Sequence, residues 1–324
     1  MRIVLMGDGE WAADSVLRLG DEGHTVAAAV VRARPTGRRL ADAARALGAR
    51  VLQPRDVSSR EFLAEIAALQ PDLLLSVAYD RILKRPLVAL PRCGSVNFHA
   101  GKLPAYRGRN VVNWAIINGE EEIGLTAHQI DEGIDTGAIL LQRTLPIRWS
   151  DTYADVLRAV VRAMPDLVAS TVRGLAEGSL TAVAQPAAGT YYGGRIEGDE
   201  WLDWRDSSRD LYNKIRGITR PGPGARTILD GGPVIIWHAE YDPAWPQYRA
   251  TPGQVVGRTA SGSAVIKSGD STLLVHEIET EGQPARPPAW PLGTRLGVNL
   301  TAALEALSAR VSQLERQREG SIHA

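Results

Sequence analysis

The N-terminal part of the chain alternates apolar, strand-like runs with amphipathic helical patterns, and this alternation limits the possible fold more than any other feature. Apolar runs at 2–6, 25–31 and 73–79 predict buried strands, and helical patterns at 37–47 and 59–69 lie between the second and the third. This order favours an α/β fold with a Rossmann-like, doubly wound, mostly parallel sheet that is covered by helices. In such a sheet, ligands bind at the carboxyl ends of the strands.

Three side chains suited to acyl transfer occur within one stretch of short apolar strands. Residues 96–98 have the character of the end of a buried strand, and alternate side chains of a strand face the same way, so Asn97 and His99 are predicted to project together. Residues 125–130 predict the next strand. The glycine-bracketed loop DEGIDTG that follows can fold Asp135 back toward the imidazole.

Acyl transfer to an amine gives each of these side chains a task. The Asn97 amide NH2 can donate to the oxyanion of a tetrahedral intermediate, and removal of one such donor typically costs about 3–4 kcal/mol. His99 can accept a proton from the attacking ammonium, and Asp135 can hold the imidazole and favour its charged form. The alternative is structural, with a histidine satisfied in the core and Asn and Asp side chains that build turns.

The same stretch resembles a known family. The runs NFHAGKLPAYRG, WAIINGE and HQIDEGIDTGAIL resemble the core of the formyltransferases that use 10-formyltetrahydrofolate, in the same order and at the same spacing. The resemblance covers roughly residues 1–280 and is sharpest at 94–142. It implies 10-formyltetrahydrofolate as co-substrate and a catalytic trio formed by Asn97, His99 and Asp135.

The resemblance also implies where folate binds. In that family the pterin occupies the crevice at the carboxyl ends of the strands, next to the main chain after the third long strand and to an acidic loop. The matching residues here are Tyr79, Ile82, Leu83, Lys84, Asp131, Glu132 and Gly133. Core packing is the alternative for Tyr79 and Ile82. A structural role is expected for His128, with folate contact as its alternative.

A third group of residues flanks the predicted catalytic strand and is expected to hold the amine substrate. Its members are Gly9, Trp11, Lys102, Tyr106, Arg107, Arg109 and Arg195. If the substrate carries a diphosphate, the four cations of this group are the nearest candidates to pair with it, since a guanidinium can bind phosphate oxygens in a bidentate manner. Alternatively, Arg107 stabilises its own loop through main-chain carbonyls.

Two other classes of function remain open from the sequence. Gly7, Gly9 and Ala12 match the G-x-G-x-x-A form of the dinucleotide-binding pattern, and Arg32 and Arg34 follow the second strand, so an NADP-binding enzyme is the runner-up. The pattern is short and common. A folate- or nucleotide-binding module without turnover is the other alternative, against which the retention of all three chemical side chains argues.

The chain is expected to contain a catalytic domain at 1–190, a connector at 191–205, an OB-like β domain at 206–283, and a proline-rich connection and helix at 284–324. Short β runs separated by Gly and Asp turns favour the β domain. The expected helix has an apolar stripe that suits packing on its own domain or on a twin subunit, so a homodimer is possible. The stripe comprises Leu300, Leu304, Leu307, Val311 and Leu314.

Composition limits the cellular setting and the ligands. A single cysteine, Cys93, excludes an internal disulfide and a multi-cysteine zinc site, and no metal is expected. The start MRIVLMG lacks the pattern of a signal peptide, and no apolar run is long enough to span a membrane. We therefore expect a cytoplasmic protein.

The charge balance bears on the acceptor. Lys plus Arg and Asp plus Glu both number 37, and acids and bases are also nearly equal after Asp206, which argues against tRNA because a tRNA enzyme is expected to carry a basic surface. The run RGRNVVNWAIINGE is similar to that of amino-sugar formyltransferases. A nucleotide-linked amino sugar is therefore the expected acceptor. The alternatives are a free, hydroxylated or carrier-bound amino acid and, after these, methionyl-tRNA.

Overall fold

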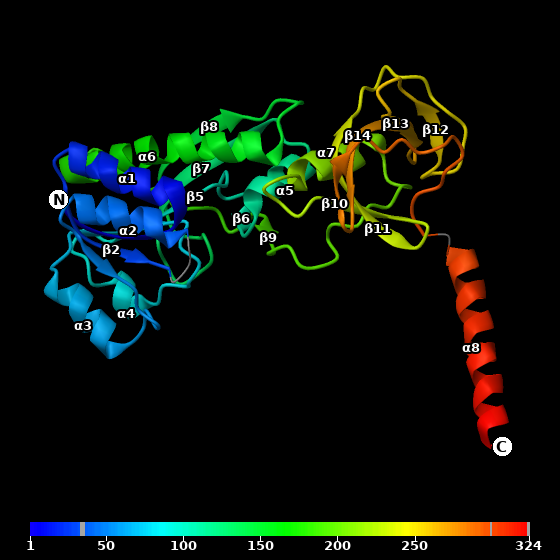
Figure 1. Ribbon diagram of the computed structural model, residues 1–324. Helices are drawn as coiled ribbons and strands as arrows, with labels where there is room; N and C mark the ends of the chain where they lie inside the picture. The colour runs from blue at the N-terminus through cyan, green and yellow to red at the C-terminus, as the bar shows by residue number, and fades with distance from the viewer. Residues whose placement is uncertain (33–35, 299, 323–324) are drawn as a thin grey trace. The chain divides into compact units, whose positions relative to one another are not determined.

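The computed structural model of the protein describes residues 1–32, 36–298 and 300–322 (Figure 1). Contacts divide the chain into two compact units, Met1–Ile196 and Glu197–Ala324. The division falls inside the connector expected at 191–205.

The first unit is built on a seven-stranded sheet with the order β3-β2-β1-β4-β5-β7-β8. The strands from β3 to β5 are parallel, whereas β7 is antiparallel to β5 and β8 is antiparallel to β7. The predicted mostly parallel, Rossmann-like sheet is thereby confirmed. Its strands are β1 (Arg2–Gly7), β2 (Thr25–Val31), β3 (Arg50–Leu52), β4 (Leu73–Val77), β5 (Ser95–His99), β7 (Glu122–Gln129) and β8 (Ile139–Pro146).

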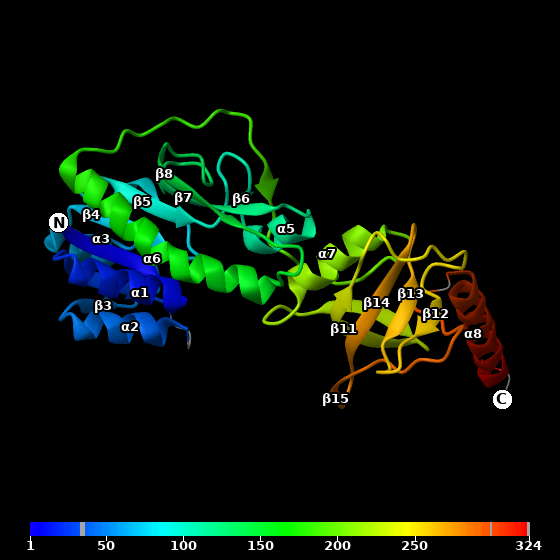
Figure 2. The same ribbon diagram turned by 90° about the horizontal axis from the view of Figure 1, so that it is seen from above.

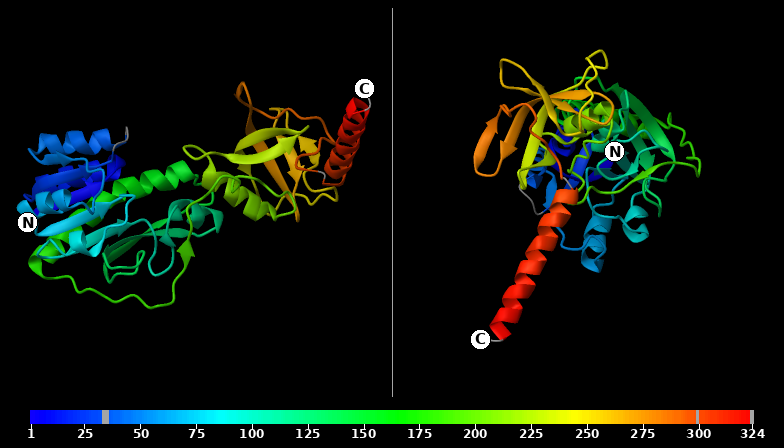
Figure 3. Two further views of the ribbon diagram at one scale, coloured as in Figure 1. Left: turned by 90° about the horizontal axis from the view of Figure 1, so that it is seen from below. Right: turned by 90° about the vertical axis from the view of Figure 1, so that its right-hand side faces the viewer.

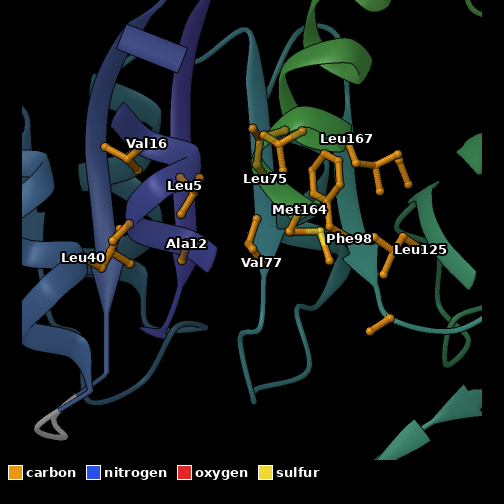
Figure 4. Packing of buried hydrophobic residues seen from close by; sticks show 14 of the residues in the cluster. Leu5, Ala12, Val16, Leu40, Leu75, Val77, Phe98, Leu125, Met164 and Leu167 are labelled. Atoms are coloured by element: carbon orange, nitrogen blue, oxygen red, sulfur yellow. The ribbon is translucent and has the colours of Figure 1, made fainter. Parts of the chain in front are cut away.

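Helices cover both faces of this sheet, and α1, α2, α5 and α6 share one face (Figures 1 and 4). Figure 4 shows Leu5, Val77 and Phe98 from the strands packed against Ala12, Val16 and Met164 from the helices, within one buried apolar cluster. Apolar residues at helical spacing supply this contact, as the sequence pattern predicts. The helices are α1 (Gly9–Asp21), α2 (Gly37–Ala46), α5 (Val111–Ile117) and α6 (Tyr153–Glu177).

The opposite face of the sheet is covered by two shorter helices, α3 (Arg60–Ala68) and α4 (Arg85–Val88). Phe62 and Ile66 of α3 and Leu87 of α4 pack against the alternate side chains of the same strands, in a second buried cluster. Because successive residues of a strand face opposite sides, one apolar run fills both cores. This explains why the strand patterns are continuously apolar and do not alternate with polar residues.

An extended segment follows α6 and returns along the unit to a short strand, β9 (Tyr191–Tyr192), as Figures 2 and 3 show. Here β9 pairs in parallel with β6 (Arg107–Gly108). The first residues of the expected connector are therefore held by the catalytic unit.

The second unit contains a six-stranded antiparallel sheet and one packed helix, α7 (Ser208–Ile218), in agreement with the expected small β domain (Figure 2). Helix α7 is absent from the elements expected from the sequence. Ser207 and Asp210 mark its start, because the Ser207 hydroxyl accepts a hydrogen bond from Asp210 N and so caps the helix. The strands are β10 (Ala225–Leu229), β11 (Gly232–Glu240), β12 (Val255–Arg258), β13 (Ala264–Lys267), β14 (Thr272–Thr280) and β15 (Gln283–Arg286).

The last element is helix α8 (Leu300–Ile322), which continues beyond the apolar stripe expected from the sequence. Four residues of that stripe, Leu304, Leu307, Val311 and Leu314, are exposed. Their pairing with a twin subunit stays a prediction. In the described part of the chain, no helix combines the length and apolar character needed to cross a membrane.

Candidate active site

Strand β5 and the loop after β7 bring together the three side chains predicted to be catalytic. In the β5–β7 register, Asn97 lies opposite His128, at the end of the strand that leads into the Asp135 loop. Asn97 Nδ2 is 3.3 Å from Asp135 Oδ1, and His99 Nδ1 is 3.7 Å from Asp135 Oδ2. The carboxylate therefore reaches both side chains that project together from β5.

The hydrogen bonds of His99 define which of its nitrogens can act as a base. Nε2 lies 2.6 Å from the carbonyl oxygen of Tyr106, and a carbonyl can only accept, so Nε2 carries the proton. In the neutral ring, Nδ1 is then the basic nitrogen and faces Asp135. Burial lowers the pKa of His99, although the Asp135 charge and the Tyr106 carbonyl act in the opposite direction. Burial thus favours the neutral ring, which is the form that can accept a proton.

Asp135 is held as an anion in an unusual backbone conformation. Its φ of 55° lies in the left-handed region. For a residue other than glycine this conformation costs about 1–3 kcal/mol, and it persists only when the surrounding structure holds it. Oδ2 accepts a hydrogen bond of 2.8 Å from Gly108 N. Burial alone would raise the pKa of this carboxyl, but the contacts with His128, His99 and Gly108 N–H outweigh it and lower the pKa to about 2.

His128 has a larger part in the site than its expected structural role. Its Nδ1 lies 2.8 Å from the carbonyl of Gln129 and carries the proton, so Nε2 accepts a hydrogen bond of 3.1 Å from Asn97 Nδ2. The two N–H groups of Asn97 are thus used by His128 and Asp135. The oxyanion role predicted for Asn97 requires that one of these bonds is exchanged for a bond to substrate.

The loop after β5 approaches His99 so closely that it needs glycine. A Cβ at Gly101 would lie 2.5 Å from His99 Nε2 and 2.5 Å from Tyr106 O, which is closer than real Cβ contacts allow. The backbone of this loop therefore forms the wall against which the imidazole is fixed.

The predicted folate residues lie on two loops that meet. Glu132 Oε1 is 3.9 Å from the guanidinium of Arg85, which directly follows the predicted Lys84, and both side chains are exposed. Tyr79 packs against the core of the α3–α4 face, in line with its packing alternative, and Leu83 is buried in the same cluster. Contact of their main-chain groups with folate stays a prediction. Ile82 is 76% exposed, and core packing does not account for it.

The acidic loop combines internal bonding with an exposed apolar side chain. Asp131 Oδ1 accepts from Gly133 N at 3.1 Å and from Thr136 Oγ1 at 2.7 Å, so this carboxylate shapes its own loop. Ile134 is 56% exposed. Like Ile82, it offers an exposed apolar side chain of the kind that suits a flat pteridine ring.

The residues predicted to hold the amine do not form one cluster. Tyr106 lies nearest to the catalytic side chains, because its carbonyl bonds His99, and its ring stacks on Tyr192 at a centroid distance of 4.6 Å. Its contact with the amine stays a prediction. Lys102 instead pairs with Glu122 on β7. Trp11 packs partly against the α1 face of the core. Its indole also lies over Gly9, whose φ is 70°.

Arg107 does not suit the phosphate-binding role predicted for it. Its side chain is buried, with the residue only 2% exposed, and it bonds Gln185, Tyr191 and the carbonyl of Pro186. The guanidinium is used by these groups, so Arg107 ties its loop to the 185–191 segment. Only the bond to Pro186 O is of the main-chain kind that the alternative expects. By contrast, Arg109 follows β6 and is exposed. The backbone N–H of Arg195 donates a hydrogen bond to Asn110 Oδ1 at 3.0 Å.

The turn after β1 argues against the NADP alternative. A Cβ at Gly7 would lie 2.6 Å from Val77 O, so this glycine serves close packing of the strands. The Arg32 guanidinium bonds Asp80 at 2.9 Å and Ala78 O at 2.8 Å, and lies 3.3 Å from Asp8, so it is not available to a 2′-phosphate. Arg34 lies outside the described residues.

Comparison with known proteins gives the family. The chain matches the model of the formyl transferase domain over residues 1–172 and that of the formyl transferase C-terminal domain over 196–290. A methionyl-tRNA formyltransferase of Pelotomaculum thermopropionicum is 35% identical over 295 residues, which cover 87% of this chain and 92% of that protein. One from Caldanaerobacter subterraneus is 35% identical over 292 residues, with 87% and 93% covered.

A solved structure supports the fold. WlaRD, a sugar 3N-formyl transferase crystallised in the presence of dTDP and 5-N-formyl-THF, has a TM-score of 0.68 at 18% identity and covers 88% of this chain and 99% of its own. In sequence, family models match both domains of this chain, and the alignments cover 92% and 93% of the two methionyl-tRNA formyltransferases. The chain therefore belongs to the formyltransferase family and is a folate-dependent N-formyltransferase with 10-formyltetrahydrofolate as its co-substrate.

Proposed function

We propose that this enzyme transfers the formyl group to the amino group of methionyl-tRNA. The observation that carries the proposal is the similarity, at 35% identity over both domains, to methionyl-tRNA formyltransferases. The proposal therefore ranks methionyl-tRNA first among the acceptors, although the sequence alone ranks it last. The likeness to the sugar enzyme is one of fold, at 18% identity, and gives less support to an amino-sugar acceptor.

The proposed chemistry follows from the hydrogen bonds of the site. The neutral amine adds to the formyl carbon, His99 Nδ1 takes the proton that the new ammonium nitrogen loses, and the Asp135 carboxylate at 3.7 Å stabilises the resulting imidazolium. Asn97 keeps its charge-assisted bond to Asp135 and exchanges its bond with His128 Nε2 for one to the formyl oxygen, which becomes an oxyanion when the amine adds. The protonated imidazole then provides the acid that the departing folate nitrogen requires.

A nucleotide-linked amino sugar is the second candidate, and the charge balance favours it. The formal net charge is zero, so tRNA would find no general electrostatic attraction. With Arg107 assigned to its loop, Lys102, Arg109 and Arg195 are the remaining residues of the cation group predicted for a diphosphate. Of these, Lys102 already pairs with Glu122, which weakens the group.

One assay distinguishes the acceptors. Purified enzyme with 10-formyltetrahydrofolate is expected to add one formyl group to methionyl-tRNA, measured by mass spectrometry of the amino acid released from the tRNA. Free methionine and a dTDP-linked amino sugar, supplied in parallel, are expected to stay unmodified. Because the formal net charge of the chain is zero, KM for the tRNA should rise only shallowly with salt.

Formylation of the amino sugar with no formylation of the tRNA would reverse the choice of acceptor. In that case Arg109→Ala should raise KM for the sugar and leave KM for folate unchanged, since binding of only one substrate is lost. Formylation of none of the three would point to a carrier-bound or hydroxylated amino acid.

A further inference from the structure

The extended segment between α6 and β9 contacts the catalytic loops through one side chain, that of Gln185. Its Nε2 donates to the carbonyl of Asp135 at 2.9 Å and to the carbonyl of Gly137 at 2.7 Å. Its Oε1 accepts from Arg107 Nε at 3.2 Å and from Arg107 Nη2 at 2.8 Å. One amide therefore joins two loops that come from different parts of the sequence.

On the Arg107 side, the joined loop holds two of the catalytic contacts. The residue before Arg107 supplies the carbonyl that bonds His99 Nε2, and the residue after it supplies the N–H that bonds Asp135 Oδ2. The Arg107 backbone is also fixed, because its N–H donates to Thr190 O at 2.9 Å. A shift of this loop would therefore move His99 and Asp135 together.

On the Asp135 side, Gln185 holds the carbonyl of a strained residue, Asp135 itself, and the carbonyl of Gly137 two residues later. The φ of Asp135 is 55°, which an L-residue adopts only when neighbouring groups hold it. Two donors from one rigid amide, on the carbonyls of Asp135 and Gly137, are suited to this task. They also fix the direction in which the carboxylate leaves the backbone.

We propose that Gln185, acting with Arg107, is a positioning residue that sets the Asp135 carboxylate against His99 and Asn97. Gln185 contacts none of the reacting groups itself. It lies in the stretch between residues 172 and 196, which neither family model matches. The inference rests on the catalytic roles proposed above, and its test therefore includes a readout that does not depend on turnover.

The first test is Gln185→Glu. Glutamate keeps the acceptor for Arg107 but loses both N–H donors and brings a negative charge to the carbonyls of Asp135 and Gly137. Because displacement of a catalytic group by about 1 Å can cost about 10²-fold, kcat should fall by about 10–100-fold. KM for 10-formyltetrahydrofolate should stay within about twofold, since ground-state binding of folate is not altered.

Gln142→Glu is the matched control. Gln142 Nε2 also bridges two acceptors, Leu103 O at 3.0 Å and Thr126 Oγ1 at 2.8 Å, but it bonds neither Asp135 nor Arg107. Its replacement should lower Tm, reduce kcat less than Gln185→Glu does, and leave the pKa of His99 unchanged, because the Asp135 carboxylate is not displaced. An equal loss of kcat in both variants would mean that any broken bridge in this unit impairs catalysis, and would overturn the specific role of Gln185.

The second readout is the pKa of His99, followed by NMR of the histidine ring in the folded enzyme. The Asp135 charge raises this pKa against the effect of burial, so displacement of the carboxylate should lower it further. Gln185→Asn, which adds no charge of its own, is the variant in which this shift is measured. Unchanged kcat together with an unchanged His99 pKa would overturn the proposal. If the wild-type enzyme formylates none of the acceptors, the proposed function fails, and the NMR titration still decides the role of Gln185.

If Gln185→Glu does not fold, Gln185→Asn tests the positioning role of Gln185 in its place. Asparagine keeps the amide but withdraws it by one methylene, so it cannot reach Arg107 and both carbonyls at once. The same two changes, of smaller size, are then expected. Wild-type values of kcat and of the His99 pKa in this variant would overturn the proposal as well.

Discussion

His99→Ala is expected to lower kcat by about 10²–10⁴-fold, the range that loss of a positioned general base typically produces. Nδ1 is the nitrogen that accepts the proton, because Nε2–H donates to Tyr106 O at 2.6 Å. Alanine offers no replacement for it, and the nearby Asp135 carboxylate, whose pKa is about 2, is too weak a base at neutral pH. The rate of formyl transfer in single-turnover reactions measures the effect directly.

The same residue should set the acid side of the pH profile. Burial lowers the pKa of His99, and the neutral ring is the active form. Wild-type kcat/KM should therefore be constant near neutral pH and fall only as the pH drops through this lowered pKa. The residual activity of His99→Ala should lack this acid limb.

His24→Ala is the control for loss of a histidine. His24 precedes β2 at the amino end of the sheet, the edge opposite to the catalytic groups, and its Nδ1 lies 3.3 Å from the N-terminal amino group. Its replacement should leave kcat unchanged. Near wild-type turnover in folded His99→Ala would remove the proposed mechanism.

The pairing of Asn97 with His99 could be predicted because it depends only on the two-residue period of a strand. The doubly wound sheet could be predicted for the same reason, since buried parallel strands give continuous apolar runs. In both cases the pattern that carries the information is local in the sequence.

The contacts that orient these side chains could not be predicted. The part played by His128 depends on the register that sets it opposite Asn97, and no local pattern encodes a register. The bond from Gly108 N to Asp135 spans 27 residues, and that from Gln185 spans 50. Arg107 illustrates the same limit, because a buried arginine and a phosphate-binding arginine look alike until the groups around them are known.

Asp135→Asn should lower kcat by about 10²–10⁴-fold, although it changes a single oxygen to an NH2 group. The carboxylate now accepts from Asn97 Nδ2 on one oxygen and from Gly108 N on the other. An amide has only one acceptor oxygen, so in either orientation its NH2 faces one of these donors. Either the bond that fixes Asn97 or the bond that fixes the Gly108 loop is lost.

The charge of Asp135 matters as much as its hydrogen bonds. Without the anion at 3.7 Å, a proton on His99 Nδ1 is no longer stabilised, so the pKa of His99 should fall and the acid limb of kcat/KM should move to lower pH. If Asp135 only shaped its loop, Asp135→Asn would lower Tm and leave both kcat and the acid limb in place. Asp72→Asn, which weakens an exposed ion pair with Arg92 at the amino end of β4, gives the matched control, and in it kcat should stay at the wild-type level. A large loss of kcat with a shifted acid limb in Asp135→Asn alone is the result that only a catalytic carboxylate explains.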